Sequence, residues 1–247
     1  MGDSMNKIRF RVINFRQFIL IAGIFSIVIA SFIVADTAAM TASSNIEQTS
    51  VPLIIIDAGH GGEDGGTSSS SGILEKNVNL AISMKIKVLL DSLGFETMMT
   101  RSDDSLFYDD SCTRMREKKV SDVHHRMELI NKYPNSIFLS IHQNHFSESK
   151  YNGAQVFYSK NNSESKEIAE VLQQSICSQL QNDNERKIKP SGTEIYLLYH
   201  AKTPAVMVEC GFLSNAGEAQ KLNDETYQTQ MSMAIVDGLI NYLNNRT

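Results

Sequence analysis

The stretch VPLIIIDAGHGGEDGG, residues 51–66, joins an apolar run to a histidine set among glycines. The run over 52–57 predicts a buried β-strand, because it is short, rich in isoleucine and followed by a glycine-rich loop. His60 therefore lies where a strand leaves the core. In open α/β sheets ligands bind at the carboxyl ends of the strands, so this position is one where chemistry is expected.

Strand-like and helix-like segments alternate along the rest of the chain, which is typical of an α/β layer structure. The chain is predicted to form a single α/β domain with a central, mostly parallel or mixed sheet of about six strands flanked by helices. Apolar residues at helical spacing predict a first helix that stops at Gly94, and a second that carries Val120, Val123, Met127 and Ile130 on one face. Two further helices are predicted over about 163–180 and 230–243. The predicted strands are 52–57, 95–101, 136–142, 154–159, 194–199 and 204–212.

The N-terminal region has a separate character. Residues 18–35 contain no charge and follow the basic residues Lys7, Arg9, Arg11 and Arg16. This pattern predicts a signal peptide or membrane anchor within 1–40, with an uncleaved anchor favoured because the apolar run just spans a bilayer. A linker is expected over 41–51 and a catalytic domain over 52–245. The basic flank stays in the cytoplasm, which places the domain outside it.

Charge and cysteine content exclude several classes of function. The chain has 23 Lys+Arg against 28 Asp+Glu, with no basic run beyond residue 50, so nucleic acid is not expected as a partner. Three scattered cysteines are too few for a disulfide framework, and no Cys-x-x-Cys pair predicts a thiolate metal site.

Polar side chains that could bind a metal follow three of the predicted strands. His60 and His142 each end one, and Glu209 lies near the end of the last, while Glu75 begins the helix after the serine-rich loop. Two imidazoles with one or two carboxylates are the ligand set of a catalytic zinc site. Each has a simpler interpretation as well: a histidine at a strand end often only forms hydrogen bonds, and an acidic residue suits a helix N-terminus. Glu209 is harder to dismiss, because a buried carboxylate is costly unless it is paired or coordinated.

Six motifs in order resemble those of one enzyme family. They are DAGHGGEDGG, LEKNVNL, MTR, SIHQNHF, GTEIYLL and PAVMVECGFLSN. Together they resemble the zinc-dependent N-acetylmuramoyl-L-alanine amidases, which are cell-wall hydrolases, over 52–243. Within that family the likeness is to the germination-specific spore-cortex amidases, which similarly have one short N-terminal segment and no wall-binding repeats.

The resemblance implies roles for particular residues. His60, Glu75 and His142 would bind zinc, while Glu209 would act on the zinc-bound water. The substrate would be peptidoglycan, cut between the lactyl group of N-acetylmuramic acid and L-alanine. In the spore cortex this reaction precedes formation of the muramic lactam needed for germination.

Three further residues are interpreted as binding substrate, namely Arg101, Asn144 and His145. The second imidazole, at His145, departs from the pattern of the family, which has a small residue there. The implied partners are the peptidoglycan substrate, the membrane through the N-terminal segment, and an extracytoplasmic activating protein. The implied location is the intermembrane space of the developing spore, with the enzyme anchored or secreted.

Two alternatives remain open at this point. A zinc carboxypeptidase could use His60, Glu63 and His142, since His60 and Glu63 form an H-x-x-E pair. Its weakness is that Glu63 lies among glycines in a flexible loop. A non-catalytic wall-binding protein is the other alternative, and the presence of Glu209 argues against it.

Overall fold

The computed structural model describes residues 51–246, and the chain from Val51 onward forms one compact unit. The strands are β1 (Leu53–Ala58), β2 (Thr97–Met99), β3 (Ser136–Asn144), β4 (Gln155–Tyr158), β5 (Lys189–Pro190) and β6 (Ala205–Phe212). The helices are α2 (Glu75–Ser92), α3 (Met115–Lys132), α4 (Glu164–Gln179), α5 (Tyr196–His200), α6 (Ala216–Leu222) and α7 (Glu225–Asn244).

The strands form a single mixed sheet in the order β2-β1-β3-β6-β4-β5. β2, β1, β3 and β6 run parallel to their neighbours, whereas β4 pairs antiparallel with β6. β1 and β3 are apolar on both faces over most of their length, as expected for central strands of a parallel sheet covered by helices on both sides. The predicted α/β class and the mixed six-stranded sheet are confirmed.

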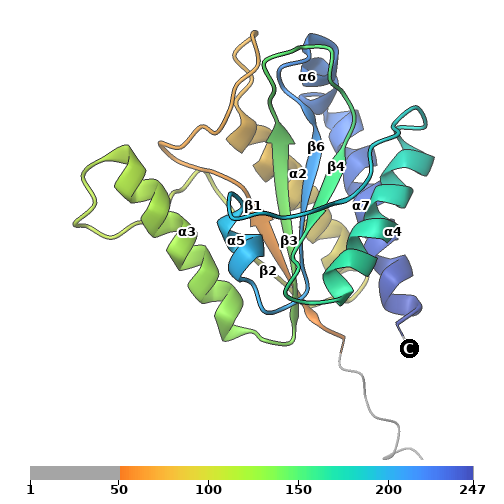
Figure 1. The fold of residues 1–247 in the computed structure, drawn as a ribbon, viewed down its shortest axis with the longest axis horizontal. Coiled ribbons are helices and arrows are strands. Elements are labelled where there is room, and N and C mark those ends of the chain that lie inside the picture. Colours follow the sequence, from red (N-terminus) through yellow and green to blue (C-terminus); the bar gives the residue numbers. More distant parts are fainter. Residues whose placement is uncertain (1–50, 247) are drawn as a thin grey trace, which may run out of the picture. The chain divides into compact units, whose positions relative to one another are not determined.

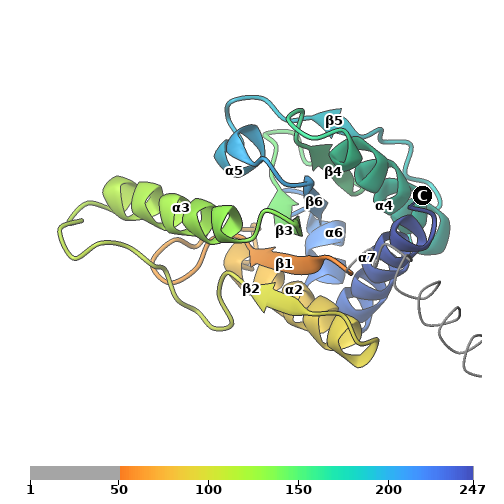
Figure 2. The same cartoon turned by 90° about the horizontal axis from the view of Figure 1, so that it is seen from below.

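Helices cover both faces of the sheet (Figures 1 and 2). α2, α4 and α7 lie on one face, and α3 and α5 lie on the other. The helix boundaries follow local sequence signals: Asp224 caps α7 through a hydrogen bond from the Tyr227 N–H, and Gly94, with φ 84°, ends the turn after α2. The predicted stop at Gly94 is therefore confirmed.

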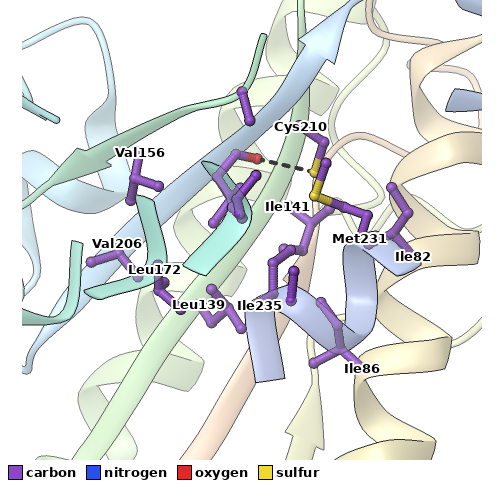
Figure 3. Packing of buried hydrophobic residues seen from close by; sticks show 14 of the residues in the cluster. Ile82, Ile86, Leu139, Ile141, Val156, Leu172, Val206, Cys210, Met231 and Ile235 are labelled. Atoms are coloured by element: carbon purple, nitrogen blue, oxygen red, sulfur yellow. Dashed lines mark hydrogen bonds between the residues drawn. The ribbon is translucent and has the colours of Figure 1, made fainter. Parts of the chain in front are cut away.

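The larger hydrophobic cluster lies between the sheet and α2, α4 and α7 (Figure 3). It consists of fully buried aliphatic side chains that come from both layers, and its members include Ile82, Ile86, Leu139, Ile141, Val156, Leu172, Val206, Met231 and Ile235. A side chain of this kind contributes about 1.5–3 kcal/mol on burial. This packing fixes the backbone of α2, which begins at a predicted site residue, Glu75.

The smaller cluster lies under α3 and α5 and holds strand residues of the opposite alternation. Its strand members include Ile55, Phe138, Ala205 and Met207, which contact Met127 of α3 and Leu197 of α5, among others. Successive strand residues point to opposite faces, so every second residue after these members lies on the same face of the sheet, nearer the carboxyl ends of the strands.

Two sequence-based predictions were wrong in detail. Residues 194–199, predicted as a strand, contain the start of the short helix α5, and the last strand of the sheet is instead β5. This segment is rich in residues that favour strands, yet it forms one helical turn that packs Leu197 and Leu198 against the sheet. Tertiary packing here overrides local propensity. In α3, Met127 and Ile130 are buried as predicted, whereas Val120 is 49% exposed because the first half of the helix extends beyond the cluster.

The predicted signal or anchor over 1–40 and most of the predicted linker lie outside the described residues. Among the residues that are described, no helix combines the length and the apolar character needed to cross a membrane.

Candidate metal centre

Polar residues replace apolar ones toward the carboxyl ends of β1, β3 and β6, on the face that bears α3 and α5. Ile55 is followed on this face by Asp57, Phe138 by Ser140 and then His142, and Met207 by Glu209. The register pairs Asp57 with Ser140 and His142 with Glu209. Strand alternation and pairing thus bring His142 and Glu209 side by side, as neighbours across two parallel strands.

His60 follows β1 in a conformation that side chains seldom adopt, with φ 62°. A non-glycine residue in this region costs on the order of 1–3 kcal/mol, which the surrounding contacts must offset. Its Nδ1 lies 2.8 Å from Oδ2 of Asp64, and this contact leaves Nε2 facing Oε2 of Glu75 at 3.3 Å. Asp64 thereby sets which ring nitrogen points into the site. Burial opposes the charged ring, but the hydrogen bonds that the ring donates to Asp64 and Glu75 outweigh it and raise the pKa of His60 to about 9.

Glu75 is a buried carboxylate held from several directions. Its Oε1 accepts from the Gln143 N–H at 3.1 Å and lies 2.9 Å from Nδ1 of His142, and its Oε2 accepts from the Thr67 N–H at 2.9 Å. It is also the first residue of α2, where the helix dipole favours negative charge. Burial alone would raise the pKa of Glu75, but hydrogen bonds and charge from His142 and His60 hold it far below its usual range.

The His142 ring packs directly on the backbone of Gly59. A Cβ atom at residue 59 would lie 2.1 Å from Nε2 of His142, so only glycine leaves room for the ring in this position. The Nε2 edge is therefore turned to the backbone, and Nδ1 is the nitrogen that meets Glu75. The His60 and His142 rings are edge to face, with centroids 5.0 Å apart.

Within the described part of the chain, one group of side chains could hold a metal ion, and it consists of His60, Glu75 and His142. Their ligand atoms lie within 4.8 Å of one another. Two imidazole nitrogens and one carboxylate oxygen make up a donor set of catalytic zinc sites, which keep a fourth position open. The residues present fit zinc, and the sequence-based expectation that these three meet agrees with the geometry.

Glu209 lies next to this group but is not part of it. Its Oε2 is buried and has no hydrogen-bond partner among residues 51–246, which is unusual for a carboxylate, because an unsatisfied buried oxygen is costly. Burial raises the pKa of Glu209 to about 7, against the lowering effect of charge on His142 and with a smaller raising effect of Glu75. A carboxyl group with a pKa near neutrality is suited to accept and return a proton.

The remaining predicted site residues take different positions. Asn144 ends β3 after an irregularity in the pairing with β6, and it is half-buried; His145, the next residue, is exposed. Arg101 is 3% exposed, and its guanidinium donates only to backbone carbonyls, among them those of Ala58 and Gly59 at 2.8 and 3.0 Å. These contacts make Arg101 a support for the loop that carries His60, rather than a group that faces substrate.

Glu63 points away from the metal group. Its two oxygens accept hydrogen bonds from Nζ of Lys118 in α3 at 2.9 and 2.8 Å, and its side chain is 56% exposed. The alternative in which Glu63 completes a carboxypeptidase site with His60 and His142 is therefore wrong for this geometry.

Sequence reasoning missed the residues that hold the ligands in place. Asn79, one turn after Glu75 in α2, donates to the Gly59 carbonyl at 3.1 Å and to Oε1 of Glu75 at 3.3 Å. The spacing of four between Glu75 and Asn79 in α2 was a signal that could have identified Asn79, whereas Asp64 lies in the loop with His60, where this spacing carries no such signal.

Another missed contribution comes from α3. Arg126 donates to Oδ1 of Asp57 at 2.6 Å and to the carbonyl of His60 at 2.9 Å, and Lys119 lies 2.6 Å from Oδ1 of Asp64. No sequence signal links these positions, because Arg126 is far along the chain from the loop that it holds.

Comparison with known proteins agrees with this site. Residues 54–241 match the family described as N-acetylmuramoyl-L-alanine amidase. The chain belongs to the N-acetylmuramoyl-L-alanine amidase family. The germination-specific N-acetylmuramoyl-L-alanine amidase of Bacillus subtilis is 31% identical over 194 residues, covering 78% of this chain and 81% of that protein.

Solved structures of amidases are also similar to this chain. The CwlD amidase from Clostridioides difficile, solved in complex with the GerS lipoprotein, is 40% identical with a TM-score of 0.75, covering 78% of this chain and 98% of that one. The catalytic domain of the amidase CwlV from Bacillus (Paenibacillus) polymyxa is 30% identical with a TM-score of 0.65, covering 78% and 98% of the two chains. The protein is a cell-wall amidase, so the carboxypeptidase and wall-binding alternatives are set aside.

Proposed function

We propose that this amidase is zinc-dependent, with His60, Glu75 and His142 as metal ligands and Glu209 as general base. The observation that carries the proposal is the unpartnered, buried Oε2 of Glu209 beside a compact His-Glu-His group. Zinc, when bound, makes water a stronger nucleophile and polarises the scissile carbonyl. Glu209 takes the proton of the attacking water and returns it to the leaving amine of L-alanine.

The substrate in this proposal is peptidoglycan, and the bond is the amide between the lactyl group of N-acetylmuramic acid and L-alanine. The test incubates the purified full chain with peptidoglycan, with and without a chelator, and identifies the new termini by mass spectrometry. Stem peptides that begin with free L-alanine are expected only without the chelator. Release of a C-terminal amino acid instead would contradict the proposal.

The assignment of Glu75 as a ligand has its own test, which compares two acidic residues. Glu75→Ala is expected to lose bound zinc and activity, because this carboxylate is buried between the two histidines. Glu63→Ala is the matched control, since its carboxylate contacts only Lys118 at the surface, and it should keep both properties within a few fold. Metal analysis of the purified variants decides, and zinc loss in the Glu63 variant alone would reverse the assignment.

We further propose that the amidase acts outside the cytoplasm in maturation of the spore cortex, anchored by its N-terminal segment. Support comes from the likeness to the germination-specific amidase of Bacillus subtilis and from the extracytoplasmic location of peptidoglycan. Membrane fractions of sporulating cells should hold the full-length chain after carbonate extraction. A mature form that begins near residue 40 would show a cleaved signal instead.

A partner protein is also part of the proposal. The CwlD amidase from Clostridioides difficile was solved in complex with the GerS lipoprotein, and the similarity to this chain covers 98% of the CwlD chain. An extracytoplasmic lipoprotein is accordingly proposed as an activating partner of this amidase. Its co-elution with the tagged amidase from detergent extracts of sporulating cells is the expected result, and an amidase that elutes alone with full activity would contradict it.

A further inference from the structure

A rigidly held arginine lies beside the strand next to Glu209. Arg186, in the segment between α4 and β5, donates through Nε to the carbonyl of Asn152 at 2.7 Å and through Nη1 to Oε1 of Gln155 at 3.2 Å. Its guanidinium lies over the ring of Phe212, 4.5 Å from the centroid. These contacts fix the plane of the guanidinium.

Arg186 forms no ion pair within residues 51–246. Its charge does act on Glu218, because burial raises the pKa of that carboxyl and Arg186 is among the groups that oppose the rise; Glu218 itself accepts hydrogen bonds from the Gly153 and Phe212 N–H groups. All hydrogen-bond acceptors of Arg186 are neutral, and no hydrogen bond from its Nη2 is formed within 51–246. In that part of the chain the arginines that form ion pairs are Arg114, Arg126 and Arg246. Arg186 is only half-buried, so its free donors remain open to a ligand.

The strand register places Gln155, which Arg186 contacts, on the face of the sheet that carries His142 and Glu209. Gln155, the partner of Arg186, is directly opposite Glu209 in the antiparallel pair of β4 and β6. Residues directly opposite point to the same face, with Cβ atoms about 4.5–5.5 Å apart. The neighbouring residue Val156 points to the opposite face, where it belongs to the larger hydrophobic cluster, which agrees with Gln155 pointing to the face of Glu209. Gln155 therefore lies between Arg186, from which it accepts a hydrogen bond, and Glu209, which it faces across the strand pair.

The chemistry of the substrate supplies an anion at a matching separation. In a stem peptide the residue after L-alanine is D-glutamate, which carries a free carboxylate when it is not amidated. Two residues of extended chain span roughly 7 Å, so this carboxylate lies about the length of one long side chain beyond the scissile bond. A planar guanidinium with free donors binds carboxylates through paired, charge-assisted hydrogen bonds.

We propose that Arg186 forms an anion subsite that binds the carboxylate of the residue following L-alanine. The proposal rests on the amidase function argued above, and it adds a determinant of substrate choice. Arg186 is a specificity-determining residue in this account, and the enzyme discriminates stems with a free carboxylate from stems with a carboxamide at that position.

The test uses two synthetic tetrasaccharides whose L-alanyl-D-glutamate stems have the γ-carboxyl blocked as an amide. They differ only at the α-carboxyl of the D-glutamate, which is a free carboxylate in one and a carboxamide in the other. For the zinc-loaded full chain, kcat/KM is expected to be higher for the carboxylate. Arg186→Gln should lower kcat/KM for that substrate by roughly 10- to 100-fold, mostly through KM, because one charge-assisted contact is lost. The carboxamide substrate should change by less than about twofold.

Two further variants separate recognition from structure. Arg186→Lys keeps the charge and should recover part of the preference for the carboxylate, which a merely structural loss would not do. Arg246→Gln is the matched control, because Arg246 is exposed and pairs with Glu164 near the C-terminus, and it should leave both substrates unaffected. Thermal unfolding of each variant checks that the fold is intact.

The outcomes distinguish this inference from the proposed function. An equal loss on both substrates in Arg186→Gln, or a parent enzyme that treats the two alike, would overturn the anion subsite and leave the amidase intact. A parent enzyme that cleaves peptidoglycan but neither fragment would also overturn it, since the carboxylate would not suffice for recognition. If the parent releases no L-alanine termini from peptidoglycan either, the proposed function itself fails.

Discussion

Two carboxylates in the same site have opposite acid–base character because their contacts differ. Glu75 receives hydrogen bonds on both oxygens, and its pKa lies far below the usual range. Glu209 has one buried oxygen, Oε2, without a hydrogen-bond partner among the described residues, and burial raises its pKa to about 7. These surroundings suit Glu75 to the proposed role of binding a cation and Glu209 to the proposed role of exchanging a proton.

The role of Glu209 leads to a prediction at the level of one atom. Glu209→Gln keeps the shape of the side chain but cannot accept a proton, so hydrolysis should fall by roughly 10² to 10⁴ fold while zinc content is retained. The parent must have Glu209 ionised, so its kcat/KM falls as the pH drops through the pKa of this group. A variant that is purified without zinc would make Glu209 a ligand instead of a base.

The contact between Gly59 and His142 leads to a second prediction. Gly59→Ala places a methyl group on the imidazole, so the ring must move and zinc affinity should fall by at least tenfold, as for other changes that disturb a ligand's support. Gly65→Ala is the matched control, because the nearest atom to its Cβ is 3.7 Å away. Competition with a chromophoric chelator measures both affinities, and equal affinities would show that the ring position is not limiting.

At the scale of elements, α3 holds the loop that carries His60 against the sheet through buried charges. Arg126 forms ion pairs with Asp57 of β1 and with Asp122 of its own helix, at 2.6 and 2.7 Å. Burial alone would raise the pKa of Asp57, but the charges of Arg126 and His142 and the hydroxyls of Ser140 and Thr100 lower it below 3.8. A group whose folded pKa is depressed stabilises the fold above its unfolded pKa, and this stability is lost as the pH falls through the folded value.

This linkage predicts how acid acts on the fold. Asp57→Asn leaves Arg126 with one partner fewer in the interior, and it should lower the free energy of unfolding by about 3–5 kcal/mol at neutral pH. The difference between parent and variant should shrink below about pH 4, where the unfolded parent takes up a proton that the folded state excludes. Urea unfolding at pH 7, 5, 4 and 3 measures it, and a difference that is constant down to pH 3 would remove Asp57 from the acid response.

Elements differed in how far the sequence could predict them. β1, β3 and β6 were predictable because each is a long apolar run, and so was α2, whose spacing and Gly94 stop agree. α5 was mispredicted as a strand, since one helical turn of Ile, Tyr and Leu has no periodicity that separates it from a strand. β5 is two exposed residues, too short to leave a pattern.

The residues of the candidate site likewise divide into those that the sequence predicts and those that it does not. His60, His142 and Glu209 were expected together because strand ends of a parallel sheet meet at one edge, and Glu75 was added to them from the first turn of the following helix. Arg126 could not be found, because only folding brings α3 against the loop after β1. Long-range support of this kind depends on tertiary packing, which a single sequence does not display.

At the scale of the molecule, the chain from Val51 onward forms one compact unit with its own core. A protein of residues 51–247 is therefore predicted to unfold in a single transition. Zinc at 100 times its dissociation constant should stabilise it by about 2.7 kcal/mol, which raises Tm by roughly 5–10 °C. Calorimetry of this fragment and of its Glu75→Ala form measures the shift, and an equal shift in both would show that zinc binds elsewhere.

The reversal of direction at β4 separates two evolutionary demands on this enzyme. β3 ends and β4 begins at the same edge of the sheet, so the connection over 145–154 starts and finishes beside the reacting groups. Surface connections tolerate changes of length and composition at low cost in free energy. The exposed part of this connection, residues 145–150, can therefore vary without shifting the strands that hold His142 and Glu209. The parallel half of the sheet preserves the reaction, and the reversed half is free to adapt it to walls of different composition.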